Sequence, residues 1–161
     1  MKKVKVLFVC VHNSARSQMA EAFLNKLAGD RFVAESAGIE AGLLNPLAVE
    51  AMAEVGIDIS QNTTRRVFDL LKSGSFFQYV ITVCDAVNAQ ECPVFPGALQ
   101  HIHWSFPDPA QLQGTHDEKM KEIRKIRDSI KEKIESWISE IAAGKDSEIE
   151  IPPLKFGMFG M

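Results

Sequence analysis

The residues best suited to chemistry are a cysteine and an arginine six positions apart, Cys10 and Arg16. Cysteine attacks only as its thiolate, and positive charge from an arginine and from a helix N-terminus stabilises that form. The inward-pointing N–H groups of a tight loop bind tetrahedral oxyanions, to which a guanidinium adds a two-pronged grip. The motif therefore predicts attack by Cys10 on the central atom of a bound oxyanion. We expect the binding loop to comprise Val11, His12, Asn13, Ser14, Ala15, Arg16 and Ser17.

The same pair also has an ordinary structural interpretation. A free cysteine is often a small buried hydrophobe, and Arg16 could be a surface residue. The surroundings favour chemistry, because Asn13, Ser14 and Ser17 can all form hydrogen bonds and Ser17 stands where a helix would start.

The elements around this motif predict an α/β fold. The apolar run 4–9 is typical of a central strand in a parallel sheet, because such strands are covered on both faces. Further strands are expected at 32–37, 78–83 and 101–104, and helices at 17–28, 45–55, 67–72 and 115–143. The helix at 45–55 carries the apolar residues Leu47, Val49, Met52 and Val55, and Thr115 with Glu118 predicts a capping box at the start of the last helix. This alternation predicts a doubly wound parallel sheet with helices on both faces. We expect one catalytic domain over residues 1–144 and a C-terminal tail over 145–161.

Two other chemically useful residues follow predicted strands. Cys84 comes directly after the strand 78–83, and Asp108 lies in a Pro-Asp-Pro turn after the strand 101–104. The carboxyl ends of parallel strands meet at one edge of a sheet, where ligands bind in such folds. We therefore expect Cys10, Cys84 and Asp108 at the same edge, with Asp108 either a general acid or a turn former.

Composition narrows the class of protein. The chain has 161 residues, 46% of them hydrophobic, and a formal net charge of -3. That charge argues against a nucleic-acid or anionic-membrane partner, and the N-terminal segment fits neither a signal peptide nor a membrane span. Three cysteines do not make a secreted disulfide framework. We expect a cytoplasmic monomer.

Five motifs together resemble the arsenate reductases built on the low-molecular-weight protein tyrosine phosphatase fold. They are Cys10-Val11-His12-Asn13-Ser14-Ala15-Arg16-Ser17, Ser36-Ala37-Gly38, Thr82-Val83-Cys84-Asp85, Cys92-Pro93 and Trp104-Ser105-Phe106-Pro107-Asp108-Pro109. The resemblance implies four parallel strands in the order 2-1-3-4. It also implies that Cys10 attacks arsenate, that Cys84 displaces arsenite by forming a disulfide, and that Cys92 relays the oxidation to an exposed disulfide. In that family a thioredoxin reduces this disulfide, and Asp108 matches the general acid.

Electron accounting favours the reductase. Reduction of As(V) to As(III) takes two electrons, which two thiols supply by forming a disulfide, and a third thiol moves that disulfide outward. Seven residues separate Cys84 from Cys92, against six in the thioredoxin-coupled enzymes, so a glutaredoxin is the alternative reductant.

The resemblance also raises the question of a potassium site. Family members that bind potassium use residues matching Asn13, Glu21 and Ser36 together with an aspartate. Arg65 stands in place of that aspartate, which argues against a cation there. We expect no required cofactor.

Two other functions compete. A phosphatase would need Cys10, Arg16 and Asp108 alone, but the phosphatases usually carry a tyrosine where this chain has Ala110. A metal-binding module could use Cys84, Cys92, His101 and His103, but their spacing is not that of a compact zinc knuckle.

Overall fold

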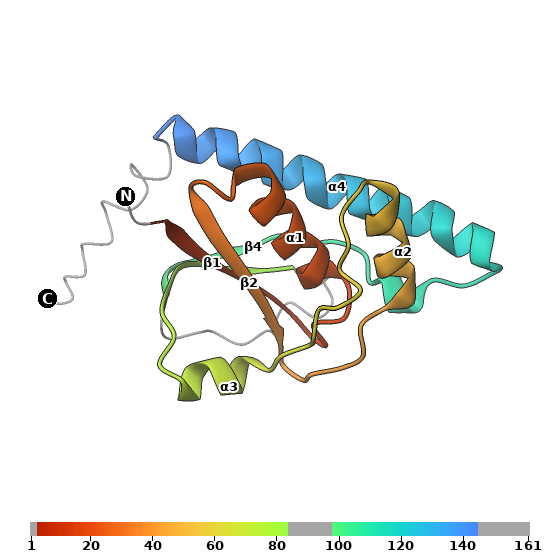
Figure 1. Ribbon diagram of the computed structural model, residues 1–161, viewed down its shortest axis with the longest axis horizontal. Coiled ribbons are helices and arrows are strands. Elements are labelled where there is room, and N and C mark those ends of the chain that lie inside the picture. The colour runs from red at the N-terminus through yellow and green to blue at the C-terminus, as the bar shows by residue number, and fades with distance from the viewer. Residues whose placement is uncertain (1–2, 84–97, 145–161) are drawn as a thin grey trace, which may run out of the picture.

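A parallel sheet forms the centre of the computed structural model, which describes residues 3–83 and 98–144 (Figure 1). Within these residues the sheet has four strands in the order β2-β1-β3-β4. Their bounds are β1 Val4–Cys10, β2 Phe32–Gly38, β3 Phe77–Thr82 and β4 Ala98–His103. All neighbouring strands run parallel, and the register pairs Cys10 with Gly38 and Thr82 with His103. The predicted fold class and strand order are confirmed, and the carboxyl ends of the strands lie at one edge.

β1 is the central strand that its apolar sequence predicts. Leu7, Phe8 and Val9 are all fully buried, although successive side chains of a strand point to opposite faces. Phe8 belongs to the larger of two apolar clusters, and Leu7 and Val9 belong to the smaller. A strand packed on both sides is held rigidly, so its last residue, Cys10, has a fixed position.

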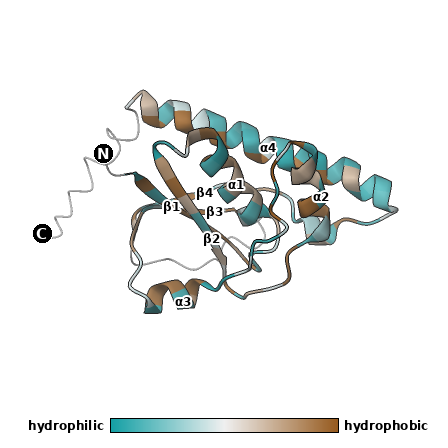
Figure 2. Cartoon of the chain, viewed as in Figure 1, coloured by the Kyte–Doolittle hydropathy of each residue, from teal (hydrophilic) through white to brown (hydrophobic). Residues whose placement is uncertain are grey.

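Helices cover both faces of the sheet, as expected (Figure 1). The larger cluster contains residues of α1, α2 and α4, and the smaller contains residues of α3. Their bounds are α1 Arg16–Ala28, α2 Pro46–Glu54, α3 Val67–Lys72 and α4 His116–Ala142. Figure 2 shows hydrophilic and hydrophobic residues alternating along α4, which is the pattern of a helix with one buried face.

Local capping explains where two of the helices begin. Asn45 accepts a hydrogen bond from the Leu47 N–H at 2.8 Å, and Pro46 follows it at the first helical position of α2. At α4, Thr115 and Glu118 form the reciprocal capping box that the sequence predicts. α4 then buries Ile123, Ile126, Ile130, Ile134 and Trp137 and leaves Ile138 and Ile141 half-buried.

Two local predictions were wrong. The buried face of α2 is Ala48, Ala51 and Met52, whereas Val55, predicted to be on that face, is 42% exposed. Small alanine side chains allow α2 to approach α4 closely, a preference that hydrophobicity alone does not reveal. Ser17 does not start α1: the helix begins at Arg16, and Ala15 occupies the cap position without a side-chain bond. No helix among the described residues has the length and apolar character to cross a bilayer.

Candidate active site

Cys10 is the last residue of β1 and only 2% exposed. The next five residues form a tight loop whose carbonyl groups are held from outside. The carbonyl oxygens of Val11 and His12 accept hydrogen bonds from Glu40 and Gly42, each at 2.9 Å. Main-chain N–H groups of the turn after β2 thus fix the loop.

The loop depends on one close approach between backbones. A Cβ atom at Gly38 would lie 2.6 Å from the Asn13 nitrogen and 2.6 Å from the Glu40 oxygen, too close for any side chain. Asn13 itself has a φ of 55°, in the left-handed region that asparagine tolerates better than most residues. The loop geometry therefore requires glycine at position 38 and favours asparagine at position 13.

Two hydrogen-bond donors converge on the Cys10 sulfur. The backbone N–H of Asn13 donates to Sγ at 3.2 Å, and the Ser17 hydroxyl lies 2.9 Å from it. The Ser17 oxygen already accepts from the Asn13 side-chain amide at 2.8 Å, so its own proton is available to the sulfur. These two contacts fix the position of the sulfur at the end of β1.

Asn13 connects this sulfur to a distant part of the chain. It is fully buried, and its Oδ1 accepts from the Arg65 N–H at 2.8 Å and from Gln18 Nε2 at 3.2 Å. Gln18 Nε2 also lies 3.1 Å from the Thr63 carbonyl oxygen, and Gln18 Oε1 accepts from Asn62. The loop is therefore braced by residues 62–65 as well as by its own helix.

Arg16 and Asp108 meet beside the loop. Arg16 is 4% exposed, and its Nη1 donates to the Phe106 carbonyl at 3.1 Å. Its Nη2 lies 3.6 Å from Asp108 Oδ1. That carboxylate also accepts from the Ala110 N–H at 2.9 Å, which starts the short 3₁₀ helix η2, Pro109–Gln111. Asp108 is thus both a turn former and a carboxylate next to Arg16, the arginine predicted to bind the anion.

The other loop residues differ in exposure. Ala15 is buried, Val11 and Ser14 are half-buried, and His12 is exposed at the rim. His12 Nδ1 lies 3.7 Å from Glu40 Oε1. The predicted loop residues 11–17 and Asp108 thus lie at one site in the structure.

The two other predicted catalytic cysteines, Cys84 and Cys92, lie outside the described residues. The chain can be followed to Val83, which is fully buried and donates its N–H to the Val9 carbonyl at 2.8 Å. Val9 immediately precedes Cys10. The last described residue before Cys84 thus lies beside the strand that ends in Cys10.

The histidines of the metal-module hypothesis, His101 and His103, are exposed on β4. His103 Nδ1 lies 2.7 Å from the Thr82 hydroxyl. In the described ranges, 3–83 and 98–144, no group of three His, Cys, Asp or Glu residues is arranged to hold a metal ion.

The sequence analysis did not predict that the Gln18 side chain and the backbone N–H of Arg65 hold Asn13. Gln18 is 1% exposed although it is polar, and it uses its whole amide to connect Asn13 to residues 62–63. A buried glutamine looks like a surface residue in a sequence, so no pattern could have identified it. Two of its partners, Asn62 and Thr63, are also more than forty positions away in the chain.

Comparisons with known proteins agree with this geometry. Residues 5–147 match the family described as low molecular weight phosphotyrosine protein phosphatase. An arsenate reductase of Halalkalibacterium halodurans is 42% identical over 138 residues, covering 85% of this chain and 96% of that protein. The structure of an arsenate reductase in its phosphate-binding state has a TM-score of 0.70 and 30% identity, covering 86% and 98% of the two chains. A thioredoxin-dependent arsenate reductase of Corynebacterium glutamicum has a TM-score of 0.53 and 32% identity, covering 83% of this chain and 62% of that one.

Proposed function

This chain belongs to the low molecular weight phosphotyrosine protein phosphatase family, and from that premise we propose that it is an arsenate reductase with a three-cysteine relay. Cys10 is the nucleophile, and Cys84 and Cys92 carry the oxidation away from it. The observation that supports the proposal is the hydrogen bond from Val83 to Val9, because it holds the residue that precedes Cys84 in the sequence beside the strand of the nucleophile. A phosphatase needs no second thiol there.

The first step adds arsenate to the sulfur. The Cys10 thiolate attacks arsenic and an As–S bond forms, while the As–O bond to a hydroxyl group of the arsenate breaks and this hydroxyl, after taking a proton from Asp108, leaves as water. Arg16 and the loop N–H groups hold the remaining oxygens, which carry the negative charge. In this step arsenic remains As(V).

The second step is the reduction. The Cys84 thiolate attacks the Cys10 sulfur, the As–S bond breaks, and its electron pair stays on arsenic, which leaves as arsenite. The two electrons come from two thiols, which become the Cys10–Cys84 disulfide. Cys92 then attacks Cys84, which frees the Cys10 thiolate and leaves a Cys84–Cys92 disulfide for an external dithiol to reduce.

Thioredoxin is the proposed reductant. A structural relative is described as thioredoxin-dependent. The relay proposed for the three thiols of this chain finishes with a Cys84–Cys92 disulfide, which a dithiol protein such as thioredoxin can reduce. The longer spacing between Cys84 and Cys92 makes glutaredoxin the reductant to compare. The cycle needs a compartment that keeps thiols reduced, so we place the enzyme in the cytoplasm.

The deciding experiment compares two reactions of the purified protein. One assay measures arsenite formed from arsenate with thioredoxin, thioredoxin reductase and NADPH, and a parallel assay replaces thioredoxin by glutaredoxin and glutathione. The other measures hydrolysis of an aryl phosphate. We expect catalytic arsenite formation, lost in Cys84→Ser and Cys92→Ser, while both variants keep any ester hydrolysis. Fast ester hydrolysis without arsenite would make the protein a phosphatase instead.

A control separates the relay from a simpler mechanism. If Cys92→Ser kept multiple turnover with thioredoxin, an external thiol would resolve the Cys10–Cys84 disulfide directly, and Cys92 would have no part in the cycle. Disulfide mapping after one equivalent of arsenate should show Cys84–Cys92 in the wild type and Cys10–Cys84 in Cys92→Ser.

A further inference from the structure

A polar pocket of about 280 Å³ adjoins the Cys10 loop, and none of its lining residues belongs to the loop 11–17. Its lining residues are Gln18, Glu21, Gln61, Asn62, Thr63 and Arg65. Four of these residues, Gln18, Asn62, Thr63 and Arg65, also belong to the hydrogen-bond network that braces Asn13. A change of charge in this pocket can therefore alter the position of Cys10, because only a few hydrogen bonds separate the pocket from its sulfur.

Two carboxylates lie near this pocket. Glu21 accepts a hydrogen bond from the Ser36 hydroxyl, and Glu35 precedes Ser36 on β2. Burial raises the pKa of Glu21, while the Ser36 hydrogen bond and the charge of Arg65 act in the opposite direction. Arg65 Nη1 lies 3.2 Å from Glu35 Oε1. Arg65 therefore faces both acidic side chains.

The side chains present do not fit a bound potassium ion. Asn13 Oδ1 already accepts two N–H donors, and the Ser36 hydroxyl directs its proton at Glu21. The guanidinium of Arg65 lines the same pocket as Glu21, so a cation there would meet a fixed positive charge. A potassium ion needs oxygen ligands that are not already used in hydrogen bonds, and Asn13, Glu21 and Ser36 offer few of them.

We propose that Arg65 is a positioning residue for Cys10, whose positive charge holds the carboxylates of Glu21 and Glu35 together at this pocket. This inference rests on the proposed function, because it concerns how the same nucleophile is held. The guanidinium offsets Glu35 and Glu21, and the backbone of the same residue supports the loop. Arg65 does not touch the reacting atoms.

The path from Arg65 to the sulfur is short. The Arg65 N–H donates to Asn13 Oδ1 at 2.8 Å, the Asn13 amide donates to Ser17 at 2.8 Å, and Ser17 lies 2.9 Å from Cys10 Sγ. The Arg65 carbonyl accepts from the Gly38 N–H at 2.8 Å, which fixes this backbone to the end of β2. Without the guanidinium, the two carboxylates would repel each other, and the backbone bonded to Asn13 would shift.

The test compares Arg65→Met with Arg65→Lys, which restores the charge, and with Arg66→Met as a matched control. Arg66 is the exposed neighbour whose guanidinium lies over the Phe68 ring, 5.4 Å from its centroid. We expect Arg65→Met to lower kcat for arsenate about tenfold with a smaller change in KM, because the nucleophile is misplaced while Arg16 still binds the anion. The kcat of Arg65→Lys should stay within about threefold of the wild-type value, and the kcat of Arg66→Met should equal the wild-type value.

A second variant tests the charge directly. Glu35→Gln removes one carboxylate, so the double variant Arg65→Met/Glu35→Gln should recover most of the lost rate. A loss of the same size in the double variant, or in Arg66→Met, would overturn the proposal. If Arg65→Met alone does not fold, the double variant carries the test, because the proposal requires it to fold and react.

A readout without arsenate separates this inference from the proposed function. In a Cys84→Ser/Cys92→Ser background Cys10 is the remaining thiol of the chain, and its alkylation by iodoacetamide can be timed at fixed pH. Arg65→Met should slow alkylation by about the same factor as it lowers kcat, and Arg65→Lys should restore it. Unchanged alkylation would overturn the positioning role even if arsenate is reduced, and slowed alkylation would support it even if arsenate is not the substrate.

Thermal melting checks the claim about the cation. The wild type should melt at the same temperature in potassium chloride and in tetramethylammonium chloride at equal ionic strength. A stabilisation specific to potassium would show that the pocket takes the ion despite Arg65, and would overturn the proposal.

Discussion

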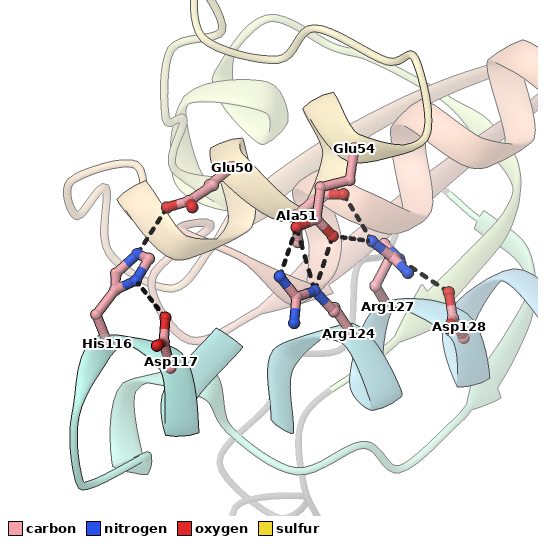
Figure 3. Close-up of polar contacts among 8 residues, drawn as sticks. All are labelled: Glu50, Ala51, Glu54, His116, Asp117, Arg124, Arg127 and Asp128. Carbon is pink, nitrogen blue, oxygen red and sulfur yellow. Dashed lines mark hydrogen bonds and ion pairs between the residues drawn. The ribbon is translucent and has the colours of Figure 1, made fainter. Parts of the chain in front are cut away.

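Two polar networks of this molecule are built in opposite ways. The network around Cys10 is buried: Asn13 and Ser17 are fully buried, and single hydrogen bonds between neutral groups connect them. The network between α2 and α4 is half-exposed and ionic (Figure 3). There Arg124 and Arg127 of α4 both bind Glu54 of α2, at 2.7 and 2.9 Å.

The difference follows from what each network has to do. Placing the proposed nucleophile requires directional contacts that water cannot replace, so its donors are buried and held by further hydrogen bonds. Joining two helices requires only attraction between them, which charges supply even where, as at Arg124 and Glu54, they stay partly exposed to water. Water and salt screen exposed ion pairs, so each contributes little, whereas a broken buried hydrogen bond leaves a polar group unsatisfied. Substitutions should therefore have much larger effects in the first network.

The largest effect is expected from Cys10→Ser. Serine can keep the contact with Ser17 but is a far weaker nucleophile, so arsenate reduction and ester hydrolysis should both fall by about 10⁴-fold or more. The melting temperature should change little. Measurable turnover in rigorously purified Cys10→Ser, with the same pH profile as the wild type, would mean that another residue is the nucleophile.

Asn13→Ala should have the next largest effect. It removes the amide that connects Ser17 to Arg65 and places alanine at a φ of 55°, so we expect a loss of about 1–3 kcal/mol in unfolding free energy and a marked loss of turnover. Asn13→Gly is the matched control, because glycine tolerates that φ without restoring the amide. If Asn13→Gly reacted like the wild type, the amide would not brace the loop. Urea unfolding and steady-state kinetics measure both effects.

Glu54→Gln should have a smaller effect, visible in the pH dependence of stability. Hydrogen bonds from Arg124, with those from Arg127, lower the pKa of Glu54 from 4.5 to about 2. Stability from this carboxylate is therefore present above pH 4.5 and is lost as the pH falls towards 2. The melting temperatures of wild type and Glu54→Gln should differ at pH 6 and converge towards pH 2. A constant difference across that range would exclude the ionised carboxylate as the cause.

His116→Gln should have the smallest effect, with the opposite sign in pH. Its hydrogen bond to Glu50, at 2.8 Å, raises the pKa of His116 above 6.5 (Figure 3). The stabilisation is full below pH 6.5 and disappears as the pH rises through the raised pKa. Melting curves of wild type and His116→Gln should differ at pH 5.5 and coincide at pH 9. Coincidence at both pH values would show that the pair contributes nothing.

The sequence was informative where structure is local. The apolar run before Cys10 predicted a central strand, and Thr115 with Glu118 predicted the start of α4, because both patterns depend on neighbours in the chain. The strand order came from the resemblance to a family. The face of α2 was predicted wrongly, since close packing of Ala48 and Ala51 against another helix is a tertiary property.

The candidate site divides in the same way. Cys10, Arg16 and Ser17 lie in one short segment and could be identified by their spacing. The Arg65 N–H that holds Asn13 comes from 52 positions away, and no sequence pattern announces such a backbone contact. Cys84 and Cys92 remain predictions because they lie outside the described residues.

The contact between Gly38 and the Cys10 loop determines when that loop can form during synthesis of the chain. A nascent chain that has emerged only as far as α1 already contains every residue from Cys10 to Ser17, yet it lacks Gly38, the turn after it and the Arg65 backbone bound to it. During synthesis the thiol is therefore exposed before its donors are in place. The loop around it is braced only after the chain as far as Arg65 has left the ribosome.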